Sequence, residues 1–127
     1  MVSKKLTRTN NESRKGSPLT NRNEVPFKIA LTGELANGFE FIDLNKSKPF
    51  HDFIKKTVYK NLTVSKVENL FLRTKGKVKE TEFVHGEERD IIHFGENKKA
   101  FRIFGYYNQD GYFVIYKIDP KHKTHKQ

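Results

Sequence analysis

Residues 100–126 read AFRIFGYYNQDGYFVIYKIDPKHKTHK, and this stretch decides the expected fold more than any other part of the chain. Apolar and aromatic side chains alternate along 101–107 and recur along 112–118, as strands with a buried face require. The polar residues 108–111 between them are typical of a turn. The stretch therefore predicts two strands that are hairpin neighbours in one sheet.

The residues before this hairpin extend the predicted sheet. Phe83-Val84 and Ile91 to Phe94 predict further strands, so the sheet is expected to be built largely from residues 78–118. Residues 85–88 and 95–97 are typical of turns, and the charged residues 87–90 are expected to be a solvated turn. Near the start, Asn37-Gly38 stands between two apolar runs and predicts a first hairpin.

Two helices are predicted in the middle of the chain. Ser47 before Lys48-Pro49 is a helix start, and Thr63 can cap a second helix. Apolar residues recur at spacings of three and four within 48–60 and 63–74, which predicts one buried face on each helix. The very short connection favours an antiparallel helix pair. The fold class is α+β: a two-helix hairpin packed on a mostly antiparallel sheet.

Composition limits the kind of protein. The 127 residues carry a net charge of +10 and a sequence pI of about 9.8. Such a charge attracts polyanions and favours nucleic acid, although it also serves solubility. The absence of cysteine excludes disulfides, thiolate metal sites and cysteine nucleophiles. The N-terminus does not resemble a signal peptide, and no apolar run is long enough for a membrane helix. We therefore expect a cytoplasmic protein with no membrane contact.

The first 25 residues differ from the rest. They are polar and basic, and their aliphatic residues have no period, so they cannot bury enough apolar surface to offset the entropy of ordering. We expect a flexible basic arm over 1–25, mobile without a partner, followed by one α+β domain over 26–127. The alternative is an inert tail.

Strand alternation separates two sets of side chains along 101–107. Phe101, Ile103 and Tyr107 are expected under the helices, which leaves Arg102, Phe104 and Tyr106 on the opposite face. We expect this second set to form an open face, on which the Arg102 guanidinium binds phosphate while Phe104 and Tyr106 stack on RNA bases. The alternative is an ordinary arginine beside a second small core.

The C-terminal tail places two histidines, His122 and His125, among three lysines, Lys121, Lys123 and Lys126. Neighbouring ammonium groups disfavour the imidazolium ion, so the tail favours a neutral histidine able to act as a base. The alternative is a solvated basic terminus. Metal binding by the two histidines has no obvious third ligand, so we expect no metal or cofactor. His93, inside an apolar strand, is expected to be a core or edge histidine.

The order helix, helix, meander, together with RIFGYY, NQDG, YFVIYKI and DPKHKTHK, resembles the RelE/HigB superfamily of bacterial toxins over residues 45–126. The resemblance implies a metal-independent endoribonuclease that cleaves mRNA, commonly on the ribosome, and is inhibited by a cognate antitoxin protein. It implies that Arg102 binds the scissile phosphate, that His122 or His125 is the acid or base, and that the tail lysines bind RNA.

Two other function classes stay open at this point. The same basic surface suits a non-catalytic nucleic-acid-binding protein. The chain also suits a phage or mobile-element accessory protein that binds another protein, because fold alone does not fix activity.

Overall fold

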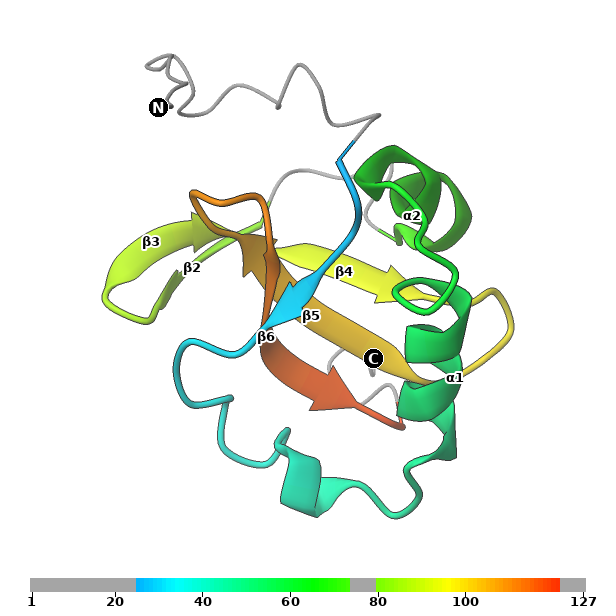
Figure 1. Cartoon of the computed structure of the whole chain (residues 1–127). Coiled ribbons are helices and arrows are strands. Elements are labelled where there is room, and N and C mark those ends of the chain that lie inside the picture. Colours follow the sequence, from blue (N-terminus) through cyan, green and yellow to red (C-terminus); the bar gives the residue numbers. More distant parts are fainter. Residues whose placement is uncertain (1–24, 74–79, 122–127) are drawn as a thin grey trace.

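The computed structural model describes residues 25–73 and 80–121, and Figure 1 shows their arrangement. The main sheet has the strand order β1-β6-β5-β4, and a separate two-stranded sheet pairs β2 with β3. Among the strands of the described residues, only the short β1–β6 pair is parallel. The elements are β1 (Ile29–Ala30), a 3-10 helix (Phe41–Asp43), α1 (Lys48–Lys56), α2 (Val64–Phe71), β2 (Thr81–Val84), β3 (Glu87–Asp90), β4 (Ile92–Gly95), β5 (Arg102–Tyr107) and β6 (Phe113–Asp119). The α+β class with two helices and a mostly antiparallel sheet is confirmed.

Both helices begin where the sequence predicted. Ser47 is the N-cap of α1, with Pro49 in its first turn, and the Thr63 side chain accepts a hydrogen bond from the Lys66 backbone N–H at 3.2 Å. Each helix ends earlier than predicted. Thr57 ends α1, and its hydroxyl donates to the Phe53 carbonyl at 2.7 Å. Leu72 ends α2 by forming a β-bridge with Phe94.

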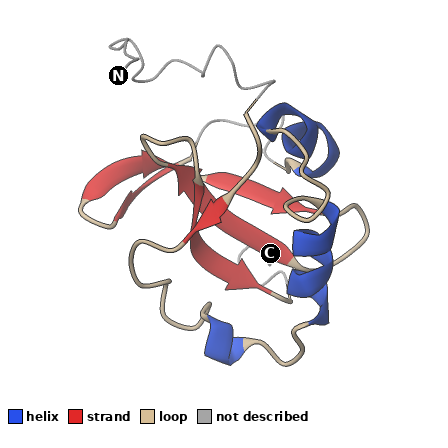
Figure 2. Ribbon diagram, in the orientation of Figure 1, coloured by secondary structure: helices blue, strands red, loops and turns tan. Residues whose placement is uncertain are grey.

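One face of the main sheet, called here the helix face, packs against α1 and α2 (Figure 2). Phe53 of α1 and Phe71 of α2 meet there with ring centroids 5.5 Å apart. Phe101, Ile103 and Tyr107 belong to this core, as their alternation predicted. In Figure 1, α2 lies beyond the upper end of α1 and not alongside it, which differs from the predicted antiparallel pair.

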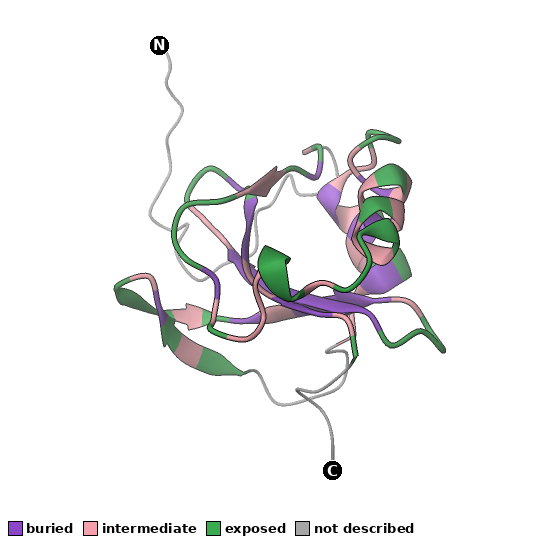
Figure 3. Cartoon of the chain, turned by 90° about the horizontal axis from the view of Figure 1, so that it is seen from below, coloured by how far each residue is buried: buried purple, intermediate pink, exposed green. Residues whose placement is uncertain are grey.

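The opposite face, called here the hairpin face, is also covered. Val84 of β2 and Ile91, which directly follows β3, pack against Phe104, Tyr106 and Val114 in a second, smaller core. Figure 3 shows the hairpin curling past the edge of the buried strands. The hairpin turns tightly at His85 and Gly86, whose φ angles of 51° and 88° suit a two-residue turn.

Two sequence predictions of local structure are wrong. The Asn37-Gly38 turn forms, but no hairpin flanks it, because β1 pairs with β6 and residues 41–43 form a 3-10 helix. Residues 87–90 form strand β3 and not a solvated turn, because their backbone pairs with β2; Glu87, Glu88 and Asp90 are exposed, whereas Arg89 is part-buried. The predicted arm, the end of the second predicted helix at residue 74 and the start of the sheet at 78–79 lie outside the described residues.

Candidate functional site

Arg102 lies on the hairpin face, at the start of β5, as strand alternation predicted. Its stem crosses Gly95, its register partner on β4, where an added Cβ would come within 2.5–2.9 Å of the Arg102 side chain. The Nη1 atom then donates to three carbonyls of the turn between β4 and β5: Phe101 at 2.8 Å, Glu96 at 3.3 Å, and Lys99. In this position the guanidinium fastens the β4–β5 turn.

The surroundings of Arg102 are electrostatically mixed. Burial lowers the pKa of Arg102, the nearby Arg73 charge lowers it further, and Asp119 acts in the opposite direction. Asp119 is fully buried and is the register partner of Arg102 on β6. Arg102 itself is only 6% exposed. A guanidinium has five N–H donors, so Nε and Nη2 keep three that the turn carbonyls do not use.

The expectation of an open aromatic face is wrong. Phe104 and Tyr106 are each only 3% exposed, because the β2–β3 hairpin covers them. The ring of Phe104 stacks on buried His93 with centroids 4.3 Å apart, and the Arg89 guanidinium lies 4.3 Å from the centre of the Tyr106 ring. Phe104 and Tyr106 are therefore core residues in this structure, and they can stack on RNA only if the hairpin moves away.

The C-terminal tail begins beside this region. Lys121 is exposed, and its backbone N–H donates to the Asp119 carboxylate at 3.3 Å. His122, Lys123, His125 and Lys126 lie outside the described residues, so their predicted roles stay predictions. The described chain nevertheless ends two residues after the register partner of Arg102.

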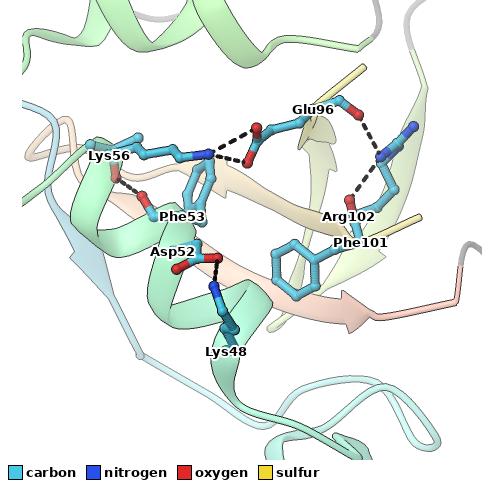
Figure 4. A network of polar contacts seen from close by, with 8 residues as sticks. Lys48, Asp52, Phe53, Lys56, Glu96, Phe101 and Arg102 are labelled. Atoms are coloured by element: carbon cyan, nitrogen blue, oxygen red, sulfur yellow. Dashed lines mark hydrogen bonds and ion pairs between the residues drawn. The ribbon is translucent and has the colours of Figure 1, made fainter. Parts of the chain in front are cut away.

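A second polar network lies on the other side of the β4–β5 turn, between the turn and α1 (Figure 4). The Lys56 ammonium donates to both carboxylate oxygens of Glu96 at 3.0 Å, although the two residues are forty positions apart. Lys48 donates to Asp52 one helical turn later at 2.9 Å. This hydrogen bond is the first cause that lowers the pKa of the Asp52 carboxyl, so Asp52 is ionised at neutral pH.

Glu96 therefore joins the two networks. Its backbone carbonyl accepts from Arg102 on the hairpin face, while its carboxylate binds Lys56 of α1 on the helix face. Figure 4 shows this arrangement, with the Phe101 ring pointing back toward Asp52. The turn is thus bound from both sides, and these contacts position it against α1.

That space is a pocket of about 240 Å³. Its lining combines apolar side chains with charged groups of both signs: Lys48, Pro49, Asp52, Phe53, Gly95, Glu96, Lys99 and Phe101. Sequence reasoning missed it, because α1 and the turn are far apart in the chain. The salt bridge between Lys56 and Glu96 has no signal in the sequence.

A further polar cluster on the hairpin face was also missed. The Glu34 carbonyl lies 2.8 Å from His85 Nε2 and can only accept, so Nε2 donates to it, and the Tyr106 hydroxyl lies within hydrogen-bond distance of Nδ1, also at 2.8 Å. Burial is the first cause that raises the pKa of Tyr116, and Glu82 raises it further by charge and hydrogen bonding. This cluster ties residues 32–36 and the hairpin to β5 and β6.

Residues 25–73 and 80–121 contain no group of three or more side chains that could hold a metal ion. In the same residues, neither helix is long and apolar enough to cross a bilayer. No family model matches the chain, and neither a curated protein nor a solved structure shows significant similarity to it.

Proposed function

We propose that this is an RNA-binding protein whose attraction for RNA comes mainly from three basic stretches that lie before, between and after the described ranges of the chain. The supporting observation is where the charge lies. Residues 1–24, 74–79 and 122–127 contain eleven of the 25 Lys and Arg but two of the 15 Asp and Glu, which makes +9 of the total +10. The described residues are close to neutral, so a polyanion is attracted chiefly by these stretches.

Two of these stretches, 74–79 and 122–127, directly follow residues of the described domain. Arg73 precedes the first, and its charge is close enough to Arg102 to lower the pKa of Arg102. Lys121 precedes the second, two residues after Asp119, the register partner of Arg102. Positive charge therefore gathers around one end of β5, and a phosphate backbone that follows either stretch passes this end.

The test compares two triple variants of equal charge in the full-length protein. In one, Lys121, Lys123 and Lys126 are replaced by serine. In the control, Lys55, Lys60 and Lys66, exposed residues on or near the helices, are replaced by serine. We expect the tail variant to bind single-stranded RNA more weakly than the control, and its salt slope to fall by about 0.7 for each RNA phosphate that is no longer neutralised by a lysine. Equal reductions in the two variants would contradict the proposed location.

A second candidate function is an endoribonuclease of the RelE/HigB type, as the sequence resemblance implies. The placement of Arg102 supports it, because Arg102 lies away from the helices and the tail departs beside it. In this reading His122 or His125 takes the proton of the ribose 2′-OH, whose oxygen attacks the adjacent phosphorus; the P–O5′ bond breaks, and the leaving 5′ oxygen takes up a proton. Because Arg102 is only 6% exposed, the β2–β3 hairpin or the β4–β5 turn would have to move for RNA to reach it, and its three N–H donors at Nε and Nη2 would then stabilise charge on the phosphoryl oxygens. RNA on the ribosome and a cognate antitoxin would be its partners.

Cleavage is tested with purified protein, single-stranded RNA and EDTA. The reaction predicts a 2′,3′-cyclic phosphate at the new end and activity without added metal. Replacing His122 and His125 together by glutamine should lower the rate by roughly 10²–10⁴-fold, the usual size of general acid-base effects. RNA binding without cleavage of either free RNA or mRNA on ribosomes would leave a non-catalytic binding protein. Absence of RNA binding would favour the third class, a protein that binds another protein.

A further inference from the structure

The pocket between α1 and the β4–β5 turn has two kinds of surface. Its walls are apolar and partly aromatic, from Pro49, Phe53 and Phe101. Its charged lining includes two ammonium groups, Lys48 and Lys99, and the ionised carboxylate of Asp52. At about 240 Å³ the pocket is smaller than the roughly 300–1,000 Å³ of sites for drug-sized ligands, so it suits a single small ring system.

The walls are held in place before any ligand arrives. The Lys56–Glu96 salt bridge ties the turn to α1, and Arg102 fastens the same turn from behind through the carbonyls of Glu96 and Phe101. Phe53 is buried, and its ring contacts the rings of the helix-face core. A rigid pocket saves a ligand the cost of ordering its walls.

We propose that this pocket binds an unpaired nucleobase of single-stranded RNA, an inference that rests on the proposed function and extends it. A base presents an apolar π-face to Phe101 and Pro49, which is the sequence-tolerant contact that proteins use for single strands. The edge of a base carries N–H groups that donate hydrogen bonds to the Asp52 carboxylate. Lys48 binds one oxygen of this carboxylate and so holds it in position. The flanking phosphate then lies near Lys48 or Lys99.

The charged groups favour a nucleotide over a purely apolar ligand. An ionised Asp52 beside an apolar wall has to be hydrogen-bonded or solvated. A purely apolar ligand would displace water from the carboxylate without replacing its hydrogen bonds. The two lysines at the pocket match the phosphate that accompanies every base of RNA.

The first experiment records backbone amide NMR shifts of the full-length protein with millimolar guanosine 5′-monophosphate, or with ribose 5-phosphate, which has the phosphate but no base. We expect the nucleotide to shift the amides of Gly95, Glu96 and Lys99, and ribose 5-phosphate to leave them nearly unchanged. Equal shifts with both compounds, or none with the nucleotide, would overturn the proposal.

The second experiment measures affinity for a short single-stranded RNA and for the same RNA with abasic sites. Base contacts to an aromatic wall give about a 5- to 150-fold gain per base, so the abasic RNA should bind more weakly by a factor in that range. Phe101→Leu and Asp52→Asn should reduce this difference, whereas the control Lys55→Ala, on an exposed position of α1 outside the pocket, should leave it unchanged.

The outcomes separate the two proposals. If the protein binds both RNAs equally well and with strong salt dependence, the RNA-binding function stands and the base pocket is wrong. If the nucleotide shifts the pocket amides but RNA longer than a few nucleotides does not bind, the pocket stands and the proposed function is wrong.

Discussion

Replacing Arg102 by alanine tests the structural role that the geometry gives to this residue. The variant removes the donor that serves three carbonyls of the β4–β5 turn. A hydrogen bond to a charged donor contributes about 1.5–3 kcal/mol. Water can replace the donor at the part-buried Glu96 and Lys99 carbonyls. Only the buried hydrogen bond to the Phe101 carbonyl therefore contributes its full value to the expected loss of stability.

The Arg102 stem adds a packing contribution. It lies over Gly95 with 6% of the residue exposed, and each buried CH₂ contributes about 0.8 kcal/mol, reduced by burial already present in the unfolded chain. Together the two effects give an expected decrease of about 2–4 kcal/mol in the free energy of unfolding. Urea unfolding followed by far-ultraviolet circular dichroism measures it.

The control and the refuting result are specific. Arg73→Ala removes a like charge that lowers the pKa of Arg102, so on electrostatic grounds we expect no decrease, or a small increase, in the free energy of unfolding. Arg102→Lys keeps one ammonium and should recover part of the stability. A decrease below about 0.5 kcal/mol for Arg102→Ala, the size of an ordinary surface substitution, would show that the turn does not depend on the guanidinium.

Three more predictions concern individual glycine and tyrosine residues. Gly105→Ala should lower the free energy of unfolding, measured in urea, by at least about 1–3 kcal/mol, because the new Cβ would lie 2.0 Å from the Val114 carbonyl oxygen. In the control Gly33→Ala the new Cβ meets only the His85 ring, so the decrease should be smaller. Spectrophotometric titration should find a tyrosine with a pKa above the ordinary value, and Glu82→Gln should lower that pKa without restoring it, since burial is its first cause. Because the pKa of Tyr116 is raised in the folded protein, the contribution of this group to stability is present below its pKa in the unfolded chain. The contribution disappears as the pH rises through its pKa in the folded protein. Tyr116→Phe should abolish this pH dependence.

The sequence was most informative where periodicity and capping chemistry act locally. Pro49 and the Thr63 cap mark the two helix starts, although the Ser47 hydroxyl makes no capping hydrogen bond, and alternation along 101–107 assigns each side chain to the correct face of β5. Alternation does not say what lies over a face. The β2–β3 hairpin covers Phe104 and Tyr106, and its strand β3 has charged side chains on a paired backbone, a pattern that resembles a solvated turn.

The pocket illustrates the other limit of sequence reasoning. Its walls come from α1 and from a turn about forty residues later, and they are joined by the Lys56–Glu96 salt bridge. Such a pairing depends on tertiary packing and leaves no periodic signal. The parallel pairing of β1 with β6 is non-local in the same way, and the local turn at Asn37-Gly38 predicted a hairpin in its place.

The salt dependence of RNA binding tests the central claim most directly. The binding constant of the full-length protein for a single-stranded RNA is measured between about 50 and 200 mM salt, the usual range for following counterion release. The measurement is repeated after deletion of residues 1–24, which carry six Lys and Arg against two Glu. The account predicts that log K falls linearly with log salt concentration and that the deletion makes the slope shallower. Binding that is absent, or that does not respond to salt, would contradict it.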